Sequence, residues 1–139
     1  MLPNLEPNES LEPVLALAQT EKVRGAAVWP LGEFKQDKAA KQLRRFLNDQ
    51  DEALKFRAAQ TLANRKDPEA LEVLLLVAND PKSRWRMYTF DSLLKYPNDP
   101  RVEKAIKSGM GDMDSQVSDA AKFAFQQLAK LKKRDPPAK

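Results

Sequence analysis

The sequence predicts an all-α fold in which about four helical hairpins form a right-handed α-α superhelix. Apolar residues recur at helical spacing, the same apolar pattern returns about every 31 residues, and a second helix-start pattern shares that period. A composition of 42% hydrophobic and 32% charged residues is typical of a folded globular chain rather than a disordered one.

The first predicted helix of each hairpin starts with a large apolar residue. A small residue follows four positions later, and a large one follows eight positions later. Spacings of four keep these side chains on one helical face. The four segments are residues 23–31, 54–62, 85–93 and 117–125. Pro30 lies inside the first segment, where we expect it to kink the helix.

A second predicted helix follows each of the first three and starts at Asp37, Asp67 and Asp99. An Asp side chain caps the unpaired N–H groups of a first turn, and the Pro after Asp67 and Asp99 suits the next position. A single hairpin cannot bury its apolar face, so stacking on neighbours supplies the core. Gly109 and Gly111 are expected to fray the end of the third of these helices.

The predicted repeat domain covers residues 10–131. Ser10 is expected to cap a short helix over residues 11–18, and a helix from Ser115 to about Lys130 closes the other end. Residues 1–9 are predicted to be a disordered N-terminal segment, and residues 132–139 a disordered basic, Pro-rich tail. The longest apolar run, residues 73–78, is far shorter than the about 20 residues that span a membrane, so no membrane association is expected.

The side chains that most often carry catalysis or bind metals are missing. The chain has no His and no Cys, which excludes imidazole bases, thiol nucleophiles and ordinary zinc sites. Asp112 and Asp114 faintly resemble the start of a calcium loop, but Val117 and Phe123 occupy the places of its Gly and Glu. We predict no catalytic residue, no metal and no cofactor. The lack of Cys suits a reducing compartment, so we expect a cytoplasmic protein.

The repeat resembles the HEAT-repeat family, in particular the compact bacterial HEAT-like repeats grouped with phycobiliprotein (PBS) lyases. The residues that carry the resemblance are Val23-Arg24 with Ala27 and Leu31, the helix start at residues 67–71, and the hairpin ends at residues 48–49 and 79–80. The resemblance implies a scaffold or recognition surface, with binding on the concave face that the second helices line.

We therefore predict a non-catalytic protein-binding adaptor or scaffold that recognises a protein or peptide partner along the second-helix face. The predicted partner-binding residues are five cations and one apolar residue: Lys38, Lys41, Arg45, Leu75, Lys104 and Lys107. The run at residues 74–77 is apolar all round, so Leu75 either packs on a neighbouring hairpin or is an exposed anchor for the partner. A monomer or weak homo-oligomer is expected.

Two other functions stay open at this point. The basic helix faces and the tail, which holds most of the net charge of +4, suit nucleic acid. The family resemblance also implies a possible accessory subunit of a phycobilin-type chromophore lyase, which would need a second chain for its chemistry. Among smaller features, Trp29 is the aromatic residue most expected to be exposed. Arg24, Arg57 and Arg86 are expected to bind acidic loop residues such as Asp49 and Asp80.

Overall fold

The structure, a computed structural model, describes residues 7–20 and 24–134 of the 139-residue chain. Within these ranges it contains eight α-helices, one 3-10 helix and no strand, which confirms the predicted all-α class. The chain divides into two compact units, residues 1–65 (the N-terminal unit) and residues 66–139 (the C-terminal unit).

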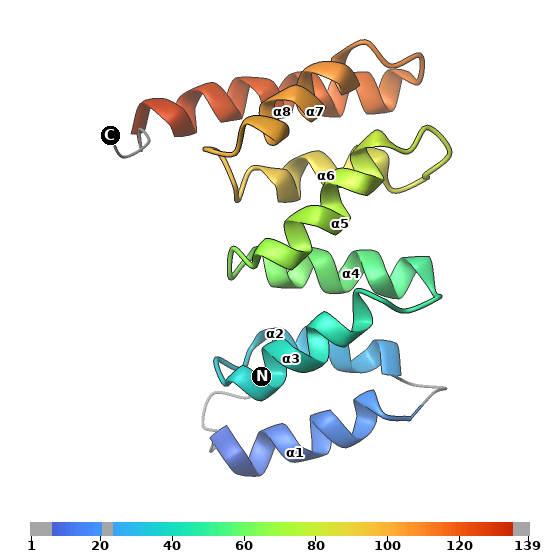
Figure 1. Ribbon diagram of the computed structural model, residues 1–139, viewed down its shortest axis with the longest axis vertical. Coiled ribbons are helices and arrows are strands. Elements are labelled where there is room, and N and C mark those ends of the chain that lie inside the picture. The colour runs from blue at the N-terminus through green and yellow to red at the C-terminus, as the bar shows by residue number, and fades with distance from the viewer. Residues whose placement is uncertain (1–6, 21–23, 135–139) are drawn as a thin grey trace. The chain divides into compact units, whose positions relative to one another are not determined.

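The N-terminal unit contains five helical elements (Figure 1). They are α1 (Pro7–Ala18), the 3-10 helix η1 (Arg24–Ala27), α2 (Val28–Gly32), α3 (Asp37–Phe46) and α4 (Glu52–Ala63). Helix α1 packs against η1, α2 and α3, while α4 packs against α2 and α3. Leu11, Leu31, Leu43 and Leu62 are fully buried. The predicted apolar faces of these helices therefore supply the core.

The C-terminal unit contains α5 (Pro68–Asn79), α6 (Arg86–Leu93), α7 (Pro100–Met110) and α8 (Ser115–Arg134). Helix α5 packs against α6 and α7, and α8 packs against α6 and α7 (Figure 1). The buried Thr89 hydroxyl of α6 donates a hydrogen bond to the Leu74 carbonyl oxygen of α5 at 2.9 Å. The Tyr96 hydroxyl donates to the Asp67 carbonyl oxygen at 2.6 Å, and burial raises the pKa of Tyr96 to about 12.

Helix starts agree with the predicted caps at two of three second helices. The side chain of Asp67 accepts hydrogen bonds from two first-turn N–H groups, and Asp99 accepts one from Arg101. The cap predicted at Asp37 is wrong, because the N-cap is Gln36 and Asp37 is the first helical residue. The cap predicted at Ser10 is also wrong, since α1 already begins at Pro7. Residues 7–9 of the segment predicted to be disordered are therefore helical, and residues 1–6 lie outside the described residues.

Three further local features of the structure differ from the predictions. The segment with Pro30 is not one continuous α-helix, since a 3-10 turn comes before a five-residue α-helix that contains the proline. The predicted fraying at Gly109 is wrong, because α7 runs to Met110 and Gly109 is buried. Helix α8 extends to Arg134, so residues 132–134 of the predicted tail are helical, and residues 135–139 lie outside the described residues.

Candidate functional site

A hollow of about 410 Å³ lies between α1 and α3 in the N-terminal unit. It is lined by Glu12, Leu15, Ala16, Gln19, Lys38, Lys41, Gln42 and Arg45. On each helix these residues are spaced three or four apart, so they form one face of α1 and one face of α3. We call this surface the α1–α3 hollow. It contains three of the predicted partner-binding residues.

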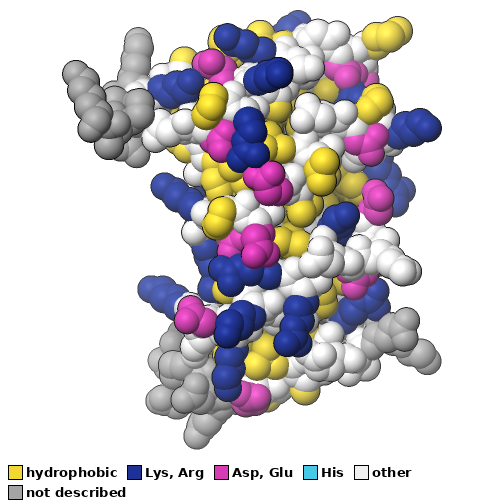
Figure 2. Space-filling model, in the orientation of Figure 1, with side chains coloured by type: hydrophobic (Ala, Val, Ile, Leu, Met, Phe, Trp, Pro, Cys, Tyr) yellow, Lys and Arg dark blue, Asp and Glu magenta, His cyan; other side chains and the backbone are white. Residues whose placement is uncertain are grey.

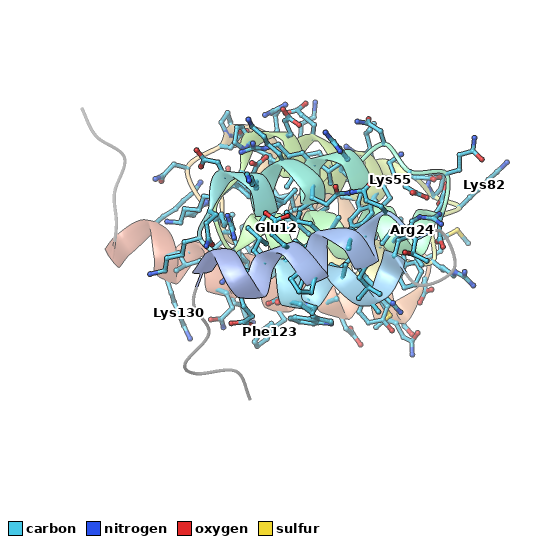
Figure 3. All side chains as sticks on the ribbon, turned by 90° about the horizontal axis from the view of Figure 1, so that it is seen from below. Glu12, Arg24, Lys55, Lys82, Phe123 and Lys130 are labelled. Carbon is cyan, nitrogen blue, oxygen red and sulfur yellow. The ribbon has the colours of Figure 1, made fainter. Side chains whose placement is uncertain are left out.

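The α1–α3 hollow carries an excess of positive charge. Glu12, which Figure 3 shows on the side of α1 that faces α3, lies 3.6 Å from the Lys38 amine. Gln42 is buried, and its side-chain oxygen accepts a hydrogen bond of 2.8 Å from the Gln19 side-chain amide. Lys41 and Arg45 are exposed, and neither has an ion-pair partner among the described side chains. Two cations are thus available to an external acceptor.

A second hollow, of about 420 Å³, lies between α5 and α7 in the C-terminal unit. It is lined by Glu72, Leu75, Leu76, Asn79, Arg101, Lys104, Ala105 and Ser108. Leu75 and Ala105 are buried, whereas the Leu76 side chain is 67% exposed. We call this surface the α5–α7 hollow. It combines an apolar floor with a polar rim, as ligand sites in proteins commonly do.

The two cations of the α5–α7 hollow differ in their availability. Arg101 pairs with Glu72 at 2.8 Å and with Asp99 at 3.0 Å. The hydrogen bonds from Arg101 hold the pKa of Asp99 below its ordinary value. Lys104 is exposed and has no ion-pair partner within the described part of the chain. Arg101 is therefore neutralised by carboxylates of its own chain, and Lys104 is the cation that an external group can use.

The predicted site residues are distributed over both units. Lys38, Lys41 and Arg45 come together in the α1–α3 hollow, and Lys104 lies in the α5–α7 hollow. Lys107 points elsewhere, since its amine lies 3.7 Å from Glu103 and 5.9 Å from the centre of the Phe125 ring of α8.

Of the two alternatives predicted for Leu75, the exposed anchor is wrong. The neighbouring residue Leu76 is exposed instead. Leu75 is only 7% exposed, because it packs into the floor between α5 and α7. Glu72, Leu76 and Asn79 are spaced four and three residues apart, which places them on one face of α5. Leu75 lies three residues after Glu72 and four before Asn79, so the spacing in the sequence does not distinguish it from Leu76. Every position of the apolar run looks equally apolar.

The remaining aromatic and arginine predictions are confirmed in part. Trp29 is 74% exposed, as expected, and Phe123 is 60% exposed. Arg24 binds Asp49 at 3.0 Å, and Arg86 pairs with Asp112, both within single units. Arg57 is exposed. The arginines that have acidic partners hold loops and helix starts together, which is a structural role.

Basic and acidic side chains are both present on the face that Figure 2 shows, with hydrophobic atoms visible between them. In the same orientation α3 passes in front of α2, so this face includes the second helix of that hairpin (Figure 1). Within residues 7–20 and 24–134, no helix is long and apolar enough to cross a membrane, and no three acidic residues gather to hold a metal ion.

Comparison with known proteins agrees with this architecture. The HEAT-repeat family matches residues 8–93, more than half of the chain. Among solved structures, human deoxyhypusine hydroxylase in complex with glycerol is similar, with a TM-score of 0.65 and 21% sequence identity. The likeness covers 94% of this chain and 49% of that protein, so the chain spans about half of its length, and it shows the fold alone. No curated protein matches the chain in sequence. HEAT repeats generally mediate protein interactions through the surfaces that stacked hairpins create. The chain belongs to the HEAT-repeat family.

Proposed function

We propose that this chain is a non-catalytic adaptor or scaffold that binds a protein or peptide partner through the exposed side chains of its second helices. The observation that carries the proposal is the α5–α7 hollow, which is lined by the exposed Leu76 and by Lys104, a cation without an ion-pair partner among the described side chains. A partner that covers Leu76 together with the apolar floor of the hollow would remove apolar surface from water, which favours binding.

The α1–α3 hollow supports the proposal with a second kind of contact. Lys41 and Arg45 are one helical turn apart on α3 and are both exposed. Exposed cations of this kind speed the encounter with an acidic partner and select against a basic one. The α1–α3 hollow thus supplies selectivity for the charge of the partner, while the α5–α7 hollow supplies apolar area for contact.

The carboxylates near both hollows favour a protein over nucleic acid. Glu12 lies at Lys38, and Arg101 is held by Glu72 and Asp99. A phosphate backbone approaching these surfaces would meet negative charge as well as positive charge. Nucleic-acid affinity depends on many cations that release counterions together. Among the described residues that line the two hollows, the cations without an ion-pair partner are Lys41, Arg45 and Lys104.

The residue inventory supports a non-catalytic role. With no His or Cys in the full sequence, imidazole acid–base catalysis and thiol chemistry have no side chain to use. The carboxylates at the hollows are exposed or paired with cations, so they lack the apolar setting that tunes a general acid.

The proposal is tested by affinity capture from a lysate of the source cells. One variant, Lys41→Glu with Arg45→Glu, reverses charge in the α1–α3 hollow. A second, Leu76→Asp with Lys104→Glu, alters the α5–α7 hollow. Leu75 is left unchanged, because it is buried and its replacement by a charge would unfold the chain. The control variant carries Lys82→Glu and Lys122→Glu, two exposed positions that line neither hollow.

We expect a protein that is retained by the wild type and by the control variant and is lost by at least one hollow variant. Circular dichroism must show the same helix content for all four proteins. Equal retention by every variant would mean that the second-helix hollows are not the binding surface. Recovery of nucleic acid alone, released by a modest rise in salt, would replace the proposal with the nucleic-acid alternative.

A further inference from the structure

We infer that the α5–α7 hollow recognises a partner segment that presents one apolar side chain and one carboxylate about a helical turn apart. The inference rests on the proposed function and deepens it by naming the chemistry of the partner. It joins three features of the hollow, namely its length, its exposed apolar side chain and Lys104, its one cation without an ion-pair partner among the described side chains.

The length of the hollow is set by the lining residues at its two ends. Glu72 and Arg101 form an ion pair across one end, and Asn79 and Ser108 are each seven residues further along the same helices. Seven helical residues span about 10 Å. A surface of this length accommodates one or two helical turns, or a few extended residues, of a partner.

The apolar part of the recognition lies in the middle of the hollow. Leu76 is 67% exposed, and the buried Leu75 and Ala105 form the floor beside it. An apolar side chain from a partner would cover Leu76 and this floor together. Removal of apolar surface from water then supplies the binding energy. The chain itself leaves this surface open among the described residues.

The charge of the partner follows from the two cations on α7. Arg101 already binds Glu72 and Asp99, so an incoming carboxylate would compete with two that are in place. Lys104, one turn further along α7, has no such partner among the described side chains. A carboxylate near Lys104 gains an ion pair, partly sheltered by the apolar contact at Leu76. A basic group there would meet repulsion from Lys104, which makes the site selective for acidic segments.

The rim at the other end adds hydrogen-bonding capacity. Asn79 and Ser108 are both exposed and line the hollow from α5 and α7. Together they offer donors and acceptors to the backbone or the polar side chains of a bound segment. They carry no charge, so the sign of the preferred partner is decided at Lys104.

The test is a selection of short random peptides, displayed on phage, on the full-length wild-type chain. We expect enriched peptides to carry Leu, Ile, Met or Phe with Asp or Glu three or four residues away. The same selection on Lys104→Glu should enrich Lys or Arg in place of the acidic residue. The most enriched wild-type peptide, made synthetically, should lose at least tenfold in affinity on Lys104→Glu and on Leu76→Asp. Lys82→Glu is the matched control, since Lys82 is exposed and lies outside the hollow, so its affinity for the peptide should stay within about twofold of the wild type.

Several results would overturn the inference. These are no enrichment above an unrelated helical protein, enriched peptides without acidic residues, or acidic peptides that bind Lys104→Glu as well as the wild type. A DNA duplex that binds the wild type and is lost on Lys104→Glu would assign the hollow to nucleic acid instead.

Lysate capture separates this inference from the proposed function. A captured protein that depends on Leu76 and Lys104, together with basic or uncharged selected peptides, refutes the inference and leaves the adaptor function standing. Selection of acidic, apolar peptides without any captured protein would support the inference and count against the adaptor function.

Discussion

Gly109 provides a sharp test of the packing in the C-terminal unit. It is buried in the last turn of α7, and a methyl group added there would lie 2.9 Å from Phe90 Cε1 and 3.0 Å from Ala121 Cβ. Carbon atoms pack best at about 3.5–4.0 Å. Phe90 is 1% exposed and Ala121 0% exposed, so neither can turn into solvent to make room. Gly109→Ala should therefore force α7 away from α6 and α8.

Two opposing effects decide the magnitude for Gly109→Ala. Replacing Gly by Ala inside a helix favours folding by up to about 1 kcal/mol, and by less in a last turn. Overpacking a close-packed core costs about 1–3 kcal/mol. The overpacking is larger, so we expect a net destabilisation of about 1 kcal/mol or more. Gly111→Ala is the matched control, since its methyl group would meet only the Ser108 carbonyl oxygen at 3.8 Å.

Urea unfolding followed by circular dichroism measures both variants against the wild type. Gly109→Ala should lower the midpoint clearly, while Gly111→Ala should leave it nearly unchanged. Phe90→Leu should create space and reduce the cost of Gly109→Ala, which appears as non-additivity in a double-mutant cycle. A Gly109→Ala protein as stable as Gly111→Ala would refute the reasoning and would mean that α7 ends more loosely than the structure shows.

Three other predictions concern single positions. Leu75→Ala should lower the free energy of unfolding by about 2–5 kcal/mol, as for other buried leucines, whereas Leu76→Ala should change it by less than about 0.5 kcal/mol; equal effects in urea unfolding would contradict the assigned burial. Lys66 has a φ of 57°, so Lys66→Gly should raise the thermal midpoint and Lys66→Val should lower it, and the opposite order would disprove the left-handed conformation. Hydrogen bonds from Arg24 and the Asp51 N–H lower the pKa of Asp49; the depressed pKa stabilises the folded state above the unfolded-state pKa of about 4, and this stabilisation is lost as the pH falls through the folded-state pKa. The stability advantage of wild type over Asp49→Asn, followed by urea unfolding from pH 7 down to pH 2, should therefore shrink below about pH 4, and a constant difference would argue against the Arg24 pair.

The apolar repeat of this sequence was sufficient to predict the all-α class, the helix order and most helix starts. The reason is local: spacings of three and four define a helical face, and Asp67 and Asp99 satisfy first-turn N–H groups within three residues of themselves. The family resemblance rests on the same short-range pattern. Asp37 shows where such reasoning fails, because an Asp near a helix start suits both the cap and the first turn.

Only the tertiary structure decided which side chains of these helices are exposed and which cations are available. Leu75 and Leu76 have the same chemistry, and their different burial depends on where α7 packs against α5. Arg101 and Lys104 are both cations on α7, but Glu72, far away in the sequence, neutralises only the first. From the sequence, Gly109 is expected to break the helix. In the structure it lies against Phe90 and Ala121, which leave no space for a larger residue. Contacts between residues distant in the sequence determine which side chains are buried and which cations are available, and local spacing does not predict those contacts.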